Sequence, residues 1–290
     1  MKKLFKILGG MLALLLVLVG GAAAWVHTQY EARASATHDV APFEIKSLVA
    51  SADVALGRRI YEVRGGCVDC HGPDLAGQRV MDNGAMGRIH GANVIPHALK
   101  DWTDEEIARA IRYGVHRTGR ALRFMPAFDY ESLSLGDVAA LVAFLRSAAP
   151  VERASVPVEI GPVAKGLFVF GKMPVLLAAH HLDLKKGFAN KPEEGPTVAF
   201  GQYLAQACTG CHGVEFRGGP IVGGDPSWPE AASARLGSGA WTEEAFSTMI
   251  RTGVSPTTRQ KLRPPMPVHL LAQMNEVEIK ALWSFLSTLK

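Results

Sequence analysis

Cysteine is scarce in this chain, and an excess of charge of one sign is missing. The 290 residues contain only four cysteines, whereas a disulfide scaffold normally serves a short, cysteine-dense chain. The formal net charge is +4, and Lys2, Lys3 and Lys6 supply three of these charges. The rest of the chain is therefore close to neutral, which predicts no nucleic-acid partner.

All four cysteines lie in two copies of one pattern, CVDCHG at 67–72 and CTGCHG at 208–213. On a helix, Cys67 and Cys70 are three residues apart and project from one face, with His71 next along the chain. The two thiols can add to the two vinyl groups of a haem, and the imidazole can then reach the iron as an axial ligand. The second copy supplies Cys208, Cys211 and His212. The sequence thus predicts two covalently bound haem c groups.

Other uses of a Cys-x-x-Cys pair fit less well. A thioredoxin-like redox motif usually accompanies a βαβ pattern, and none is apparent near either copy. A zinc site could join the two pairs, but it would give no reason for a histidine to follow each pair directly. Covalent haem accounts for both cysteines and the histidine of each copy and leaves no cysteine over.

The one long hydrophobic run lies at the N-terminus, where MKKLFK is followed by twenty uncharged, mostly apolar residues at 7–26. This length is sufficient for a membrane-spanning helix, and the preceding lysines favour the cytoplasmic side. The prediction is an anchor in the bacterial cytoplasmic membrane with the remaining chain in the periplasm. A cleaved signal peptide is the alternative, since small residues at 22–24 could form a cleavage site.

The two motifs are 141 residues apart, and other features recur near this offset, as in a duplicated domain. The segments 138–148 and 279–289 share an apolar stripe at i, i+3, i+4 and i+7, which predicts amphipathic helices. Ser134 and Asn275 are suitable N-caps for them. Each unit therefore ends in a helix.

A second pair of helices is predicted at 102–115 and 241–254, at an offset of 139. Thr103 and Thr242 are expected to be the N-caps, with acidic residues in each first turn and a capping box between Thr103 and Glu106. Gly114 and Gly253 are expected to end these helices. Further helical stretches precede the motifs, at 53–63 and 197–207.

These patterns predict an all-α chain with no runs of strand periodicity in the repeated units. The expected divisions are an anchor or signal at 1–30, a first domain at 40–150, a linker at 151–196 and a second domain at 197–290. The linker includes GLFVFGKMPVLLAAHH, which is too interrupted by Lys172 and Pro174 for a full membrane span. We expect it to pack against one domain or to lie on the membrane surface.

Both repeats resemble class I cytochrome c domains. The resemblance rests on GRRIYEVRGGCVDCHGPDLAG, WTDEEIARAIRYGV and MPAF in the first repeat, and on GQYLAQACTGCHG, WTEEAFSTMIRTGV and PPMP in the second. As a whole, the chain is similar to membrane-bound cytochromes c, including cytochrome subunits of periplasmic dehydrogenases. Those subunits typically carry three haems, whereas this chain has two motifs.

Methionine is the usual sixth iron ligand in class I domains, because its soft thioether favours ferrous iron. Met125 follows His71 by 54 residues, and Met266 follows His212 by the same 54. Both precede a proline in a loop between predicted helices. The expected axial pairs are therefore His71 with Met125 and His212 with Met266.

Other side chains could compete for the iron but have no counterpart at the repeat offset. The competing methionines are Met81, Met86, Met249 and Met274. The competing histidines are His90, His97 and His116 in the first repeat, and His180 and His181 between the repeats. We expect the histidines of the first repeat to be surface or loop residues.

Two haems with both axial sides filled predict an electron carrier rather than an enzyme. The expected function is transfer of single electrons between a periplasmic donor and a respiratory-chain acceptor. The resemblance implies redox proteins as partners: a periplasmic dehydrogenase or quinol-oxidising complex, and a terminal oxidase or soluble cytochrome. The alternative is a haem enzyme, such as a dihaem peroxidase or a thiosulfate-oxidising cytochrome.

Overall fold

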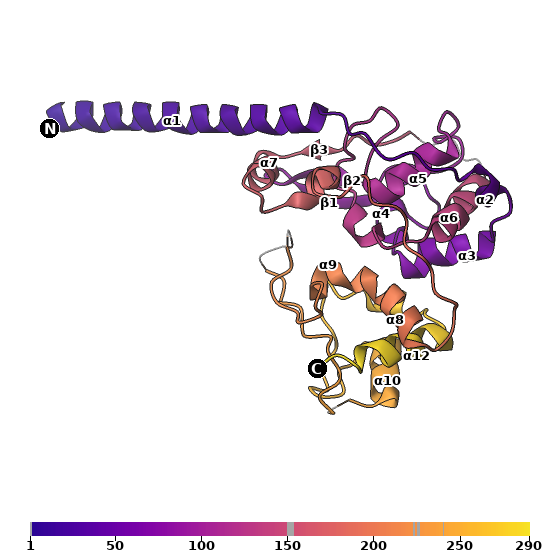
Figure 1. Cartoon of the computed structure of the whole chain (residues 1–290). Coiled ribbons are helices and arrows are strands. Elements are labelled where there is room, and N and C mark those ends of the chain that lie inside the picture. The colour runs from indigo at the N-terminus through magenta and orange to yellow at the C-terminus, as the bar shows by residue number, and fades with distance from the viewer. Residues whose placement is uncertain (1, 150–153, 223, 225–226, 240) are drawn as a thin grey trace.

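The computed structural model describes residues 2–149, 154–222, 224, 227–239 and 241–290. The predicted domain boundary at 150–151 lies outside these residues. A single long helix, α1 (Lys2–Ser35), projects from a globular body that consists of two helical parts (Figure 1). The chain is mostly helical, which confirms the predicted all-α class.

The first part surrounds the first cysteine motif. Its elements are α2 (Lys46–Ala50), α3 (Val54–Arg59), η1 (Ile60–Arg64), α4 (Val68–His71), α5 (Asp104–Tyr113), η2 (Ala127–Tyr130) and α6 (Leu135–Ser147). Its core includes Ile60, Ile107, Leu141 and Phe144. Since these residues come from three different elements, η1, α5 and α6, the core joins the helices on either side of the motif.

The second part repeats this arrangement around the second motif. Its elements are α8 (Val198–Ala205), η4 (Gln206–Cys208), α9 (Thr209–His212), α10 (Glu243–Thr252), α11 (Val268–Leu271) and α12 (Glu276–Leu286). Phe200, Phe246, Ile279 and Phe285 lie in its core. The core also includes Val63 from η1 of the first part, so the two parts are in direct contact.

In both parts, the helix before the motif crosses the last helix at a glycine. A Cβ atom on Gly57 of α3 would lie 1.9 Å from the carbonyl oxygen of Ala140 in α6. A Cβ atom on Gly201 of α8 would lie 1.8 Å from the carbonyl oxygen of Ala281 in α12. Only glycine permits this close approach of two backbones.

The helix boundaries follow the predicted capping residues. Thr103 and Glu106 form the expected capping box at α5, and Ser134 and Thr242 cap α6 and α10. Asn275 caps α12 and forms a second capping box with Glu278. Gly114 and Gly253 end α5 and α10 with φ of 64° and 67°, a left-handed conformation that glycine adopts readily.

A small antiparallel sheet of three strands interrupts the helical pattern, which the sequence analysis did not anticipate. It consists of β1 (Arg79–Asn83), β2 (Gly87–His90) and β3 (Glu159–Ile160), in that order. Asn83 and Gly84 begin the turn between β1 and β2, and an Asn-Gly pair is a recognised hairpin signal. The strands are only two to five residues long, too short to form a recognisable run of strand periodicity.

The segment between the two parts packs against the first part and α1, which confirms one of the two predicted placements. It contains α7 (Pro162–Val169) and η3 (Pro174–His180). Phe168 of α7 and Leu176 and Leu177 of η3 are buried in a cluster with Tyr30 of α1 and Val115. The pair α7 and η3 is bent by 52° at the break between them.

Within the described residues, α1 is the one helix that is long and apolar enough by itself to cross a membrane. Residues 2–25 of α1 are all exposed, and burial against the globular body begins at Val26. This helix extends well beyond the predicted span at 7–26. Its last turns, with Tyr30 and Ala34 buried, belong to the globular body.

The helix crossings generate a prediction on stability. Gly57→Ala or Gly201→Ala should force two backbones apart and lower the free energy of unfolding by about 1–3 kcal/mol, as overpacking typically does. Denaturant unfolding of each variant would measure this loss. Gly166→Ala in α7 is the matched control, because its Cβ would meet no atom within 4 Å; it should gain about 0.5–1 kcal/mol from helix propensity. Unchanged stability of both crossing variants would contradict the prediction.

Candidate functional site

Each cysteine motif forms one short helical turn. Cys67 is the N-cap of α4 and His71 its last residue, while Cys208 and His212 hold the same places in α9. The chain leaves each turn through a glycine with positive φ, which is 77° at Gly72 and 74° at Gly213. The first and second cysteines are therefore one helical turn apart, as predicted, with the histidine directly following.

The first part contains a cavity of about 770 Å³ that brings together all four residues predicted for its site. The motif lines this cavity with Cys67, Cys70 and His71. Met125, from the loop after α5, also lines it. The volume lies within the range of roughly 300–1,000 Å³ typical of cofactor pockets. Most of the remaining wall is apolar and includes Leu99, Ile107, Ile111, Leu141 and Leu145. A covalently held haem fits this donor set and this lining.

Hydrogen bonds orient both histidines in the same way. Nδ1 of His71 donates to the carbonyl oxygen of Ala92 at 2.8 Å, and Nδ1 of His212 donates to the carbonyl oxygen of Ala232 at 2.8 Å. With the proton on Nδ1, the lone pair of Nε2 is available to a metal. A metal-bound histidine usually has such a partner, which fixes its tautomer and ring orientation.

Burial favours the neutral forms of His71, Cys67 and Cys208. It lowers the pKa of His71, an effect only partly offset by the hydrogen bond to Ala92. It raises the pKa of the Cys67 thiol to about 12 and that of the Cys208 thiol to about 11. A zinc site joining the two pairs would need their thiols close together, and no three His, Cys, Asp or Glu side chains converge on a metal-holding cluster in the described part of the chain. The zinc alternative is therefore unsupported.

The two methionines lie in loops with the same backbone pattern. The amide of Leu122 donates to the carbonyl of Gly114 and that of Leu262 to the carbonyl of Gly253, both at 2.7 Å. The carbonyl of Met125 accepts from Ala127 at 2.8 Å, and that of Met266 accepts from Val268 at 2.9 Å. Met266 is half-buried. The matched sequence spacing therefore corresponds to a matched loop.

The cavity wall also contains polar residues that the sequence analysis missed or placed elsewhere. His90 and His116 line the cavity, and His116 lies in the loop after α5, as expected of a surface or loop residue. His90 lies in the unanticipated β2, and the His116 ring packs edge-on against Trp102 at 4.7 Å. The third histidine of the first repeat, His97, is exposed as expected.

Two tyrosines donate hydrogen bonds to the backbone on either side of the first motif. The hydroxyl of Tyr61 donates to the carbonyl of Gly72 at 2.6 Å, and the hydroxyl of Tyr130 donates to the carbonyl of Gly65 at 3.1 Å. Both side chains are buried and line the cavity. Their hydrogen bonds hold the backbone on both sides of α4, a role that no local sequence signal indicates.

His180 and His181 lie away from the cavity. Nε2 of His180 donates to the carbonyl of Arg33 at 2.9 Å, and its ring contacts that of His38 at 4.5 Å. The ring of His181 packs against Phe168 at 6.1 Å. These contacts give both histidines a place in the cluster between η3 and the end of α1.

The two parts are joined by a buried carboxylate. The side chain of Glu278 in α12 is fully buried and forms ion pairs with Arg59 and Arg64, which flank η1. Burial would raise the pKa of Glu278, but hydrogen bonds from both arginines outweigh it and hold this pKa below its usual range. Arg64 also pairs with Glu194 at 3.1 Å. This network fixes the second part to the first.

At the same interface, the turn after each methionine packs against the motif of the other part. Nε2 of His269, in α11, lies 2.8 Å from Oδ1 of Asp69, inside the first motif. Asp129 of η2 faces the second motif, where a Cβ on Gly210 would lie 2.7 Å from its Oδ1. The arrangement is reciprocal, so the two motifs and the two methionine turns all meet at one interface.

Comparisons with known proteins agree with this geometry. Residues 52–145 match the family described as cytochrome c oxidase, cbb3-type, subunit III, and residues 198–290 match the cytochrome c family. A dihaem cytochrome c-type protein of Cereibacter sphaeroides is 25% identical over 232 residues, which cover 70% of this chain and 74% of that protein. The chain is a dihaem cytochrome c. It carries two haem c groups and functions in electron transfer.

The interface of this dihaem cytochrome should depend on Glu278. Glu278→Gln leaves two arginines without a buried counter-charge, which should cost roughly 3 kcal/mol. In calorimetry of the whole protein, we expect the second domain to unfold in a separate transition at lower temperature. Glu276→Gln is the matched control, since this neighbouring side chain is 69% exposed and pairs with Arg251; it should cost under about 1 kcal/mol. Identical behaviour of the two variants would rule out this role for Glu278.

Asp129 should make the stability of the cytochrome depend on pH. Burial raises the pKa of its carboxyl from 3.8 to about 6. The folded protein therefore binds this proton more tightly than the unfolded chain. The contribution of the protonated carboxyl to stability is fully present below about pH 4 and is lost as the pH rises through 6. At pH 7, Asp129→Asn should be more stable than the parent by on the order of 2–3 kcal/mol.

Denaturant unfolding at a series of pH values would test this prediction. The advantage of Asp129→Asn should disappear toward pH 4. Asp82→Asn, in the exposed hairpin, is the control and should follow the parent at every pH. An advantage that stays constant with pH would show that the Asp129 charge is not responsible.

Proposed function

We propose that this dihaem cytochrome is a membrane-anchored electron carrier with both haem irons closed on both axial sides. The observation that carries this proposal is the cavity in the first domain, where Cys67, Cys70, His71 and Met125 meet. A histidine and a methionine on one cavity give an iron two protein ligands. An enzyme would instead need an open coordination position for its substrate.

Four cysteines and two histidines hold the cofactors in this proposal. Cys67 and Cys70 attach one haem, and Cys208 and Cys211 attach the other, through thioether bonds to its vinyl groups. His71 and His212 are the first axial ligands, each oriented by the backbone carbonyl that its Nδ1 contacts. Fixed orientation keeps the ligand in place in both oxidation states and limits reorganisation.

Met125 and Met266 are the proposed second axial ligands. When bound, the haem irons supply a reversible one-electron change of oxidation state. The thioether favours the ferrous state and raises the reduction potential relative to an imidazole. The apolar wall around Met125 excludes water from the site, which tunes the potential in the same direction.

We further propose that the donor is a periplasmic redox protein, such as a dehydrogenase or a quinol-oxidising complex. The acceptor is a component of the respiratory chain, either a terminal oxidase or a soluble cytochrome. The match of the first domain to a subunit family of a cytochrome c oxidase supports an oxidase-linked role. The exposed, apolar α1 supports attachment to the cytoplasmic membrane, with both haem domains on the periplasmic side.

The proposed domain division is an anchor at 1–30, a first cytochrome domain at 40–150, a linking segment at 151–196 and a second domain at 197–290. The family matches at 52–145 and 198–290 lie inside the two cytochrome domains. The linking segment contributes β3 to the sheet of the first domain, through pairing with β2. It therefore connects the domains and also covers the first.

The ligand assignment predicts the outcome of methionine replacement. Met125→His or Met266→His should leave the protein folded and lower the potential of one haem, because imidazole lacks the thioether preference for ferrous iron. Met125→Ala or Met266→Ala should instead open that iron to carbon monoxide. Redox titration and the optical spectrum with carbon monoxide would measure both effects, with two haems per chain confirmed by the pyridine haemochrome assay.

Met81→Ala is the matched control, because Met81 lies half-buried in β1 and has no repeat counterpart. It should change neither potential and should not admit carbon monoxide. Ready binding of carbon monoxide by the unmodified protein would overturn the carrier proposal, since at least one iron would then lack a firm sixth ligand.

A further inference from the structure

One side of α7 presents apolar residues that the rest of the described chain leaves partly exposed. Val163, Leu167 and Phe170 are spaced at i, i+4 and i+7 and so share one side of the helix. They are 48%, 36% and 66% exposed. On the other side, Ala164 and Phe168 are buried against α1 and the first domain. The helix is thus apolar on both sides, although only one side is packed against protein.

The position of α7 along α1 can be compared with the edge of the predicted membrane span. The apolar run at 7–26 is long enough to cross the hydrocarbon layer of about 30 Å. Burial of α1 in the globular body begins at Val26, so the edge of the membrane lies close to this residue. The ring of Trp25 contacts that of Phe170 at 6.3 Å between centroids. Phe170 therefore lies at the level where the span ends.

A polar contact indicates how α7 is placed along α1. Nζ of Lys165 lies 2.7 Å from the carboxylate of Glu31, which is more than one turn beyond Trp25 along α1. The helix α7 therefore extends from the end of the span toward the globular body. Trp25 is 51% exposed, and tryptophan is enriched where membranes meet water.

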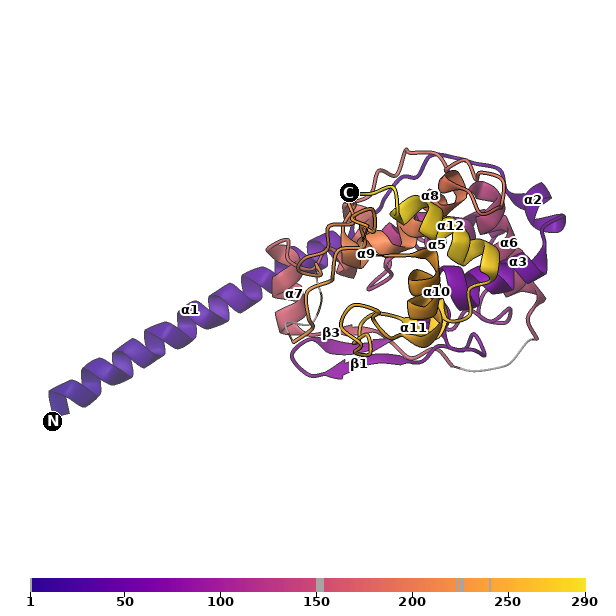
Figure 2. The ribbon, with the colours of Figure 1, turned by 90° about the horizontal axis from the view of Figure 1, so that it is seen from below.

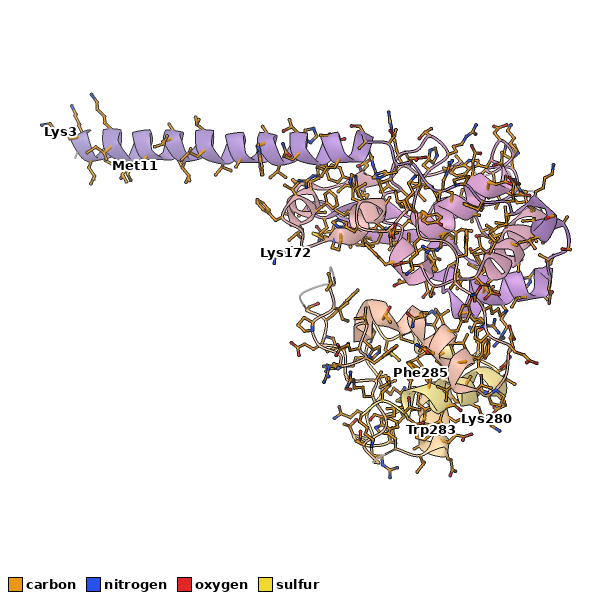
Figure 3. The ribbon with its side chains drawn as sticks, viewed as in Figure 1. Lys3, Met11, Lys172, Lys280, Trp283 and Phe285 are labelled. Carbon is orange, nitrogen blue, oxygen red and sulfur yellow. The ribbon has the colours of Figure 1, made fainter. Side chains whose placement is uncertain are left out.

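Two views agree that α7, in the linking segment, is the part of the globular body nearest to the free portion of α1. In Figures 1 and 2, the α7 segment lies beside the last turns of α1 and projects toward its N-terminal end. Figure 3 shows Lys172 just beyond α7, on the side away from α1. A lysine beside an apolar surface can extend its ammonium to lipid headgroups while its alkyl stem stays in the apolar layer.

We propose that Val163, Leu167 and Phe170 form a second membrane contact, inserted in the interfacial layer of the bilayer that α1 crosses. The lipid is identified as the occupant because this surface continues directly from the membrane-spanning part of α1. Two contact points fix both the tilt and the height of the first domain above the membrane. The proposal rests on α1 crossing the membrane but does not depend on how the haems are ligated.

Lipid crosslinking from single positions of the full-length protein would test this contact. Phe170 is replaced by the photoreactive analogue benzoylphenylalanine, and the protein is reconstituted in vesicles of phosphatidylethanolamine and phosphatidylglycerol. Illumination followed by mass spectrometry measures the yield of lipid adducts. We expect the yield at 170 to approach that at position 11 in α1, which is Met11 in Figure 3. Leu167 replaced in the same way provides an independent second position.

Position 48 is the matched control. Leu48 is 40% exposed, like Leu167, but it lies in α2, at the far end of the body from the free part of α1 (Figure 1). The yield at 170 should exceed that at 48 at least several-fold. A yield at 170 no higher than at 48, or crosslinks to a second copy of the chain, would overturn the second contact.

The outcomes also separate this proposal from the others. If position 11 forms adducts and positions 167 and 170 do not, only the second contact fails. If position 11 forms none, the anchor and the second contact fail together. An unchanged haem spectrum of each variant shows that the domains are folded, so an absent adduct cannot be attributed to a misfolded protein.

Discussion

The close crossing of two helices at a glycine is the constraint on which each domain depends. Gly57 lies against the backbone of Ala140, and Gly201 lies against that of Ala281. The helix that enters each crossing leads directly into a cysteine motif, while the partner helix closes the apolar core on which the methionine loop rests. In the first domain, Met125 packs against this core, so the crossing helices support the side of the cavity that Met125 lines.

A buried charge network organises the next level, the contact between domains. Glu278 is removed from water and depends on Arg59 and Arg64 for compensation. Such groups contribute little to net stability, because desolvation offsets much of the attraction. Their value is geometric, since the carboxylate and the guanidinium groups satisfy each other in few arrangements. Tyr203 adds to this by donating to the carboxylate of Asp137 at 2.7 Å across the same contact.

Local features of this protein could be predicted from its sequence, whereas contacts between distant residues could not. The caps at Thr103, Ser134, Thr242 and Asn275 depend on neighbours within three residues, so the pattern alone specifies them. Repetition further singled out Met125, which lines the cavity, and Met266 as the proposed ligands. The pairing of Arg59 with Glu278 spans 219 positions, and the place of His116 in the cavity wall depends on packing against Trp102. No periodicity or capping signal indicates such contacts. The sheet could not be predicted either, because its strands are too short to form a periodic run.

The continuity of α1 determines how the cytochrome can meet other proteins. The helix runs from Lys2 to Ser35 without a break, and its last turns are part of the folded body. With α1 as the proposed anchor, no flexible tether would separate the body from the membrane. A tethered carrier can search the surrounding volume at the end of its linker, whereas a body anchored in the proposed way would be carried rigidly and would explore a thin layer by lateral diffusion. Encounters are then two-dimensional collisions at one fixed height, and a partner must present its own redox centre within that layer.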